Sequence, residues 1–241
     1  MLKGFWKLSW LEIKIFMREP GGVIGSLIFP LVIFYILGRS LSPEEREVAR
    51  QAPFNVVIVA SLVLAVSSVI SLVAIISIYR EGGILKRLRA TPLSPLTILG
   101  SQVFVKMLFT VASLALLTLA GREWGTVDVD LLSFTGAFLL GTLSITALGF
   151  VVASLVPTSR FAQPLSAALF YPMIALSGVF FPIERLSQPM QIVALLLPTT
   201  HAVTLMEGVW AGTGWGWTSP VALVATCAIC GLITVRYFRW E

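Results

Sequence analysis

Six long stretches of this sequence contain no acidic residue, and together they contain a single basic one. The stretches span residues 21–37, 54–78, 98–120, 131–156, 161–181 and 218–235, and the one charge is Lys106. A helix needs about 20 apolar residues to cross the hydrocarbon core of a bilayer. Each stretch comes close to that length, so the sequence predicts an all-α membrane protein with six transmembrane helices.

The composition excludes a water-soluble domain. Hydrophobic residues fill 57% of the 241 positions and charged residues only 12%, whereas a soluble domain has about 25% charged residues. The net charge of +5 would suit nucleic acid, but the basic residues lie between the apolar stretches. Membrane proteins place them there against anionic lipid or partner proteins. We therefore expect membrane lipids, and no nucleic acid, among the partners.

The basic residues also predict the orientation of the chain. With six spans, both termini and the alternate loops share one side of the membrane. That side collects the larger group, Lys3, Lys7, Lys14, Arg18, Arg80, Lys86, Arg87, Arg89, Arg160, Arg236 and Arg239, and the other side collects Arg39, Arg46, Arg50, Arg122 and Arg185. Because Lys and Arg concentrate in cytoplasmic loops, we expect a multi-pass protein of the cell (inner or plasma) membrane with both termini in the cytoplasm.

Residues 1–20 form an amphipathic pattern before the first stretch. At about 100° per residue, one sector of the helix collects the basic side chains, Lys3, Lys7, Lys14 and Arg18. This arrangement predicts an interfacial helix lying in the headgroup layer. Glu12 points away from the basic stripe, and the interfacial position does not explain it. For Lys106, near the start of the third stretch, we expect snorkelling to the nearer interface rather than contact with a substrate.

Two segments on the expected outer side carry helical signals of their own. In residues 42–51, Ser42 and Pro43 suit the start of a short helix and Glu45 suits a capping box. Residues 182–217 contain two short apolar helices divided at Pro198, each too short to cross the membrane. They predict an extracellular re-entrant hairpin, which is tolerated at membrane depth only against protein or a cavity.

The sequence lacks the patterns of nucleotide binding and of catalysis. It has no phosphate loop of the form G-x-x-x-x-G-K-[ST]. Its only histidine, His201, would not share a helix face with Glu207. An intramembrane enzyme would need a nucleophile and a base brought together, so we expect a chain that is no enzyme and binds neither cofactor nor metal. Cys227 and Cys230 lie in an apolar run and are expected to be buried thiols.

Residues 80–92, REGGILKRLRATP, form a compact cationic segment between the second and third stretches. The acidic residue Glu81 suits the start of a short helix, and the basic residues suit its end, because of the helix dipole. Gly83 and Pro92 bound this helix, and one apolar edge is formed by Ile84, Leu85 and Leu88. Two interpretations remain open: a polybasic loop that faces lipid, or a docking helix for another protein.

The segment resembles the coupling helix of type-two ABC exporter permeases, a family of drug, lipid and polysaccharide exporters. The family pattern is an acidic residue, one variable position, Gly-Thr-Leu and a charged turn that ends in Ala-Thr-Pro. The matching residues here are Glu81, Gly83, Leu85, Leu88, Ala90, Thr91 and Pro92, with Ile84 in place of Thr. The resemblance implies a surface for an ATP-binding subunit that also includes Lys86, Arg87 and Arg89.

A second resemblance lies before the sixth stretch. The family's Ser-Gly-x-x-Phe-Pro pattern, followed by a short helix and a turn, is matched by Ser177, Gly178, Phe181, Pro182 and Pro198. Leu197 and His201 stand where the family commonly has Asn and Tyr. The resemblance implies an outer gate built from this re-entrant region, with His201 at the bend.

The resemblance further implies two permease subunits, identical or different, each paired with a separate subunit that holds ATP and magnesium. Within the family, the cytoplasmic segment is closest to the drug exporters, so we expect an amphipathic drug or lipid as the substrate. A lipid-linked polysaccharide or teichoic acid is the alternative. An ATP-independent channel or carrier is a third hypothesis, but it would give the docking helix no purpose.

Overall fold

The computed structural model describes residues 2–18, 23–24, 28–29, 31–32, 35–36, 56–89, 94–121, 130–156, 158–180 and 182–237. Its elements are α1 (Leu2–Arg18), α5 (Val56–Glu81), α6 (Ile84–Arg89), α7 (Pro95–Gly121), α8 (Leu131–Leu155), α9 (Ser159–Ala175), the 3-10 helix η3 (Ile183–Arg185), α10 (Gln188–Leu196), α11 (Pro198–Trp210) and α12 (Thr218–Tyr237). The predicted all-α class is confirmed for these ranges. The outer helix expected at residues 42–51 lies outside them, as does most of the first expected span.

The second to sixth expected spans overlap α5, α7, α8, α9 and α12, and α9 ends at Ala175, six residues before the expected end of the fifth span. Three segments of the described chain are long and apolar enough to cross a membrane, namely Thr97–Leu117, Leu131–Leu155 and Thr218–Arg236. Helices α10 and α11 reach that threshold only as a pair, and they are bent by 81° at their junction. The total of six spans stays a prediction.

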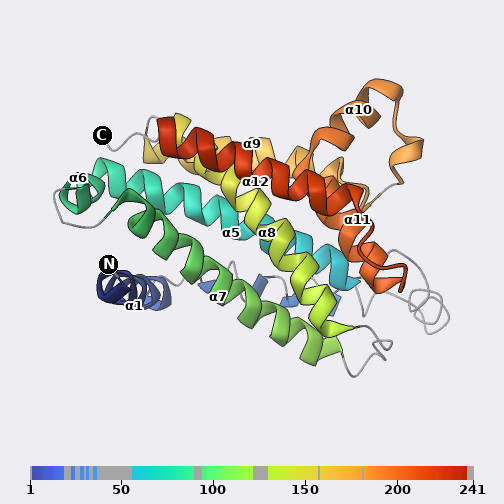
Figure 1. The fold of residues 1–241 in the computed structure, drawn as a ribbon, viewed down its shortest axis with the longest axis horizontal. Helices are drawn as coiled ribbons and strands as arrows, with labels where there is room; N and C mark the ends of the chain where they lie inside the picture. Colours follow the sequence, from blue (N-terminus) through green and yellow to red (C-terminus); the bar gives the residue numbers. More distant parts are fainter. Residues whose placement is uncertain are drawn as a thin grey trace.

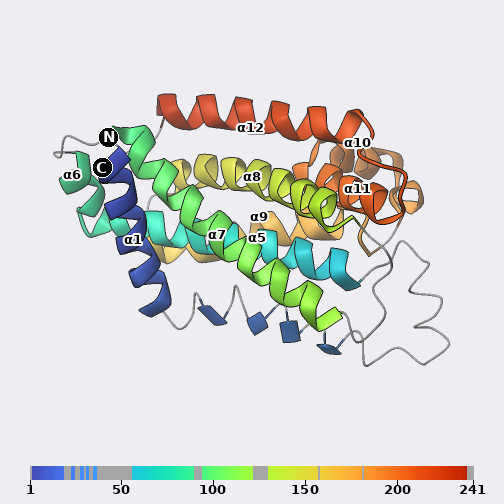
Figure 2. The same cartoon turned by 60° about the horizontal axis from the view of Figure 1, so that its bottom comes forward.

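The long helices run side by side, with α6 at one end of the bundle and α10 at the other (Figure 1). The end of α12 and the helix α1 lie at the α6 end, and α1 runs crosswise to its neighbour α7 (Figure 2). The central helix is α8, which packs against α5, α7, α11 and α12. Its side chains Phe134, Phe138 and Ile145 are fully buried.

Small residues allow the close approach of helices to α8. A Cβ atom added at Gly141 would lie 2.7 Å from the Cβ of Ala202 on α11. One added at Gly149 would overlap Val69 on α5. Such contacts through small residues are the usual means of close packing in membranes, where no hydrophobic effect drives two helices together. The backbone of α8 therefore approaches α5 and α11 directly.

Candidate functional site

The cationic segment folds as a separate short helix at the end of α5. The chain leaves α5 through two turn hydrogen bonds, from the Gly82 N–H to the Ile78 carbonyl (2.9 Å) and from the Gly83 N–H to the Arg80 carbonyl (3.0 Å). Gly83 has a φ of +65°, which is the left-handed conformation that glycine adopts at helix ends. Helix α6 begins at the next residue, so the predicted boundary at Gly83 is confirmed.

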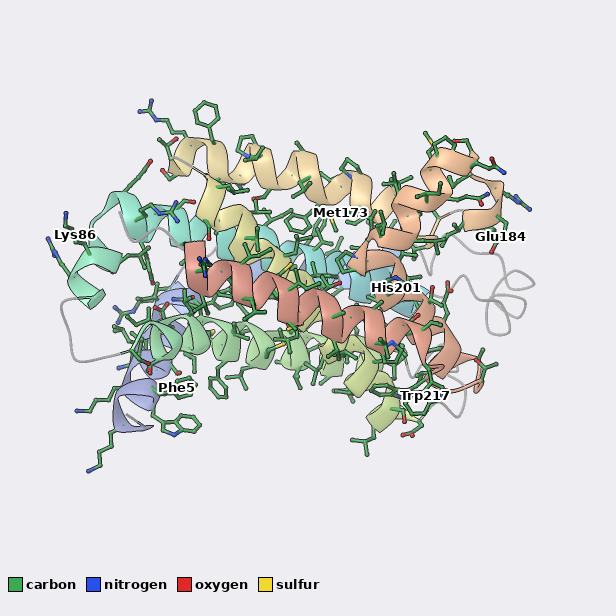
Figure 3. The ribbon with its side chains drawn as sticks, turned by 45° about the horizontal axis from the view of Figure 1, so that its top comes forward. Phe5, Lys86, Met173, Glu184, His201 and Trp217 are labelled. Atoms are coloured by element: carbon green, nitrogen blue, oxygen red, sulfur yellow. The ribbon has the colours of Figure 1, made fainter. Side chains whose placement is uncertain are left out.

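Helix α6 exposes basic side chains, and one residue of its predicted apolar edge is buried. Lys86 and Arg87 are exposed, and Ile84 is 38% exposed. Leu85 is only 2% exposed and belongs to the hydrophobic core. The prediction that Leu85 lies on an exposed docking edge is wrong, because its side chain packs into the core and anchors α6 to the bundle. Lys86 lies at the far end of the molecule from Glu184 (Figure 3).

Four of the predicted docking residues cannot be placed in this surface. The side chains of Leu88 and Arg89 lie outside the described part of α6, and Thr91 and Pro92 lie in the undescribed range 90–93. Their predicted roles stay predictions.

Arg80 links the end of α5 to the end of α8. Its guanidinium donates to the carbonyl of Val156 (2.7 Å) and to that of Ala153 (2.8 Å). Ala153 lies in the last turn of α8 and Val156 is its C-cap residue. Carbonyls at this end have no partner within the helix, and the dipole favours a positive charge there. Arg80 is itself buried, so this contact is an internal cap of α8 and no surface feature.

Glu81 links the same end of α5 to the start of α9. Its carboxylate accepts hydrogen bonds from the Ser159 backbone N–H (2.7 Å) and from the Ser159 hydroxyl. Thr158, which precedes α9, makes no side-chain cap, so Glu81 caps α9 from another helix. The hydroxyl and then the backbone N–H of Ser159 lower the pKa of Glu81. The predicted position at the start of α6 is wrong: Glu81 ends α5, and its charge faces the α9 dipole.

Tyr79 links α5 to α1. Its hydroxyl donates to the Glu12 carboxylate (2.9 Å), and Glu12 is only 6% exposed. Burial raises the pKa of Glu12, and hydrogen bonds from Tyr79 and Gln102 and the charge of Lys106 partly offset that rise. These contacts account for the glutamate that the amphipathic pattern left unexplained.

Lys106 points into the molecule and not toward an interface. It is 4% exposed, donates to the Ser71 hydroxyl and lies 4.8 Å from the centre of the Phe16 ring. The expectation that it snorkels is wrong, because Ser71 and the nearby Glu12 provide polar partners inside the bundle.

The second set of predicted residues meets where α9 ends and α10 and α11 begin. Ser177 is fully buried and donates to the Ile174 carbonyl (2.6 Å). Gly178 has a φ of +92°, and Pro182 is exposed and directly precedes η3. Phe181 lies outside the described residues. The structure thus places a tight, glycine-dependent turn after α9.

Pro198 and His201 lie at the bend between α10 and α11. Pro198 is buried at the start of α11, and the Nε2 atom of His201 is 2.9 Å from the Leu195 carbonyl. Nothing in the sequence pattern indicated Thr199, whose hydroxyl donates to the Met173 carbonyl (3.0 Å) and fastens α11 to α9.

The family model described as ABC-2 type transporter matches residues 3–209. These residues run from α1 almost to the end of α11 and include both sets described above. The chain belongs to the ABC-2 type transporter family. The permease is also 28% identical over 217 residues to nodulation protein J of Neorhizobium galegae, covering 85% of the permease and 78% of the relative. Nodulation protein J of Rhizobium meliloti (strain 1021) is 28% identical over 123 residues, which cover 50% of the permease and 43% of that relative.

Family membership and the apolar helices make the chain a multi-pass membrane permease, the transport subunit of an ABC transporter. The family also implies an ABC ATP-binding partner.

Proposed function

We propose that the permease is the membrane subunit of an ATP-driven exporter and that α6 is its coupling helix. The proposal rests chiefly on α6 itself: a short helix set apart by Gly83, anchored by the buried Leu85 and exposing Lys86 and Arg87 at one end of the bundle. The basic helix α1 and the end of α12 lie at the same end (Figure 1). Since basic residues mark the cytoplasmic side, this end faces the cytoplasm.

In this mechanism, the partner subunit holds ATP and magnesium and pushes on α6 when it closes around the nucleotide. Two permease subunits, identical or different, rock against each other, and the path opens outward. The bend at Pro198 and His201, together with the turn at Ser177 and Gly178, forms the outer gate. The buried bond from Thr199 to the Met173 carbonyl supports this role, because it would transmit a movement of α9 to α11.

An amphipathic, drug- or lipid-like substrate is the first candidate. An open groove of about 540 Å³ between α7 and α8 is lined by apolar side chains, including Phe104, Met107 and Leu143. Such a lining suits the apolar part of an amphipathic ligand. Both relatives are named for nodulation and neither for drug resistance, so the second candidate is a lipid-linked polysaccharide or teichoic acid of the same family.

Reversing the exposed charge of α6 tests the docking surface. The variant Lys86→Glu with Arg87→Glu is expected to reduce retention of the ATP-binding subunit about tenfold or more, because like charges then meet across the interface. The measurement is co-purification with a co-expressed ABC ATP-binding subunit, followed by substrate-stimulated ATP hydrolysis.

Arg185→Glu is the matched control, since Arg185 is exposed on η3. It follows Glu184, which lies at the opposite end of the molecule from Lys86 (Figure 3). The control variant should leave retention unchanged. If the double reversal also retains the ATP-binding subunit in full, α6 does not carry the docking surface. Leu85 is unsuitable for this test, because its burial would turn a polar substitution into a folding defect.

A further inference from the structure

We propose that Tyr79, Arg80 and Glu81 form a three-way linkage that passes a displacement of α6 to α1, α8 and α9 together. The role of α6 as the coupling helix comes from the proposed function, and the linkage adds the route by which its movement enters the bundle. The inference rests on the side-chain hydrogen bonds of these three residues. They are consecutive in one helix turn, and each is bonded to a different neighbouring helix.

The helical repeat explains why one turn can reach three neighbours. Successive side chains project about 100° apart around a helix axis, so three consecutive residues cover more than half of its circumference. Tyr79 reaches Glu12 on α1, Arg80 reaches the last turn of α8, and Glu81 reaches Ser159 on α9. These contacts join positions that are 67, 76 and 78 residues apart in the chain.

Arg80 and Glu81 hold the two sides of a single junction. Helix α8 ends at Leu155 and α9 begins at Ser159, so the arginine binds the negative end of one dipole and the glutamate the positive end of the next. Charged groups make stronger hydrogen bonds than neutral ones. A shift at the end of α5 therefore moves the junction or breaks several charge-assisted bonds at once.

Helix α6 is fastened closely to this linkage. Only Gly82 and Gly83 separate it from Glu81, and both of their N–H groups are bonded back to the last turn of α5. The Arg87 N–H is bonded to the Gly83 carbonyl (3.1 Å), and Leu85 is packed in the core. Movement of α6 therefore carries the end of α5 with it instead of being absorbed in a loose hinge.

The test measures the linkage in the permease alone. Spin labels are placed at Lys86→Cys on α6 and Gln163→Cys on the exposed face of α9, with the two free cysteines removed as Cys227→Ala and Cys230→Ala. The parent should give one narrow distance distribution in lipid nanodiscs. Glu81→Ala and Arg80→Ala should lose that narrow peak, while Arg236→Gln, an exposed control on α12, should keep it.

A conservative pair keeps the test decisive if an alanine variant fails to fold. Arg80→Lys and Glu81→Gln retain a donor and an acceptor but lose the forked guanidinium and the carboxylate charge. Both should broaden the distribution, and an unchanged peak in them overturns the linkage.

A second readout separates the linkage from the proposed function. In unlabelled permease, Arg80→Lys and Glu81→Gln should retain the ATP-binding subunit while substrate no longer stimulates its ATP hydrolysis. One outcome is that the variants broaden the spin-label distance distribution as expected while the parent retains no ATP-binding subunit. In that case the linkage is supported and the proposed coupling role of α6 is wrong. If stimulation is unchanged in variants that bind the subunit, the linkage does not transmit the movement.

Discussion

One added methyl group at Gly149 is expected to destabilise the permease by about 1–3 kcal/mol, the usual cost of overpacking a dense core. A Cβ atom there would overlap the Cγ1 atom of Val69 on α5 and lie 3.9 Å from the Cδ2 atom of Leu72. Val69 and Leu72 are completely buried, so neither has open space to enter. The contact between α5 and α8 must widen to admit the methyl group.

Gly231→Ala on α12 is the matched control, because a Cβ atom there would meet nothing within 4 Å. The midpoint of thermal unfolding in detergent should fall for Gly149→Ala and stay level or rise for Gly231→Ala, since alanine favours a helix more than glycine does. Adding Val69→Ala to Gly149→Ala should restore part of the loss by returning the volume. Equal midpoints for the two single variants would show that α5 and α8 are not packed this closely.

The helices of this permease could be read from the sequence because each depends on local pattern. The charge-free stretches at residues 131–156 and 218–235 locate α8 and α12 to within two residues at each end. The division at Pro198 and the break at Gly83 were predictable for the same reason: proline and glycine restrict or release the backbone where they stand.

The partners of the buried polar residues could not be read in this way. The sequence around Glu81 favours a local role for its carboxylate, at the start of a short helix. Its true partner, Ser159, is 78 residues away, and nothing in the pattern of either segment points to the other. Glu12 gave a clearer signal, since a carboxylate that leaves the polar face of an amphipathic helix must find a buried partner.

Removing the charge of Lys106 is expected to destabilise the permease by about 3–5 kcal/mol, because one partner of a buried ionic cluster is then left alone. In Lys106→Met, the Glu12 carboxylate keeps its bond from Tyr79 but loses the nearby positive charge that favours ionisation. Adding Glu12→Gln should recover most of the loss, since no uncompensated charge remains. Lys7→Met, at an exposed position of α1, is the control and should change little.

The dependence on pH distinguishes this electrostatic cause from a packing defect. Burial already raises the pKa of Glu12, and loss of Lys106 raises it further. A carboxyl with a raised pKa in the folded state contributes full stability below its ordinary pKa and loses that contribution as the pH rises through the folded value. The deficit of Lys106→Met in the unfolding midpoint should therefore grow as the pH rises above the ordinary pKa of a glutamate, and the Glu12→Gln double variant should not show this growth. A deficit that does not change with pH would mean that Lys106 acts by filling space beside Phe16 and not by compensating Glu12.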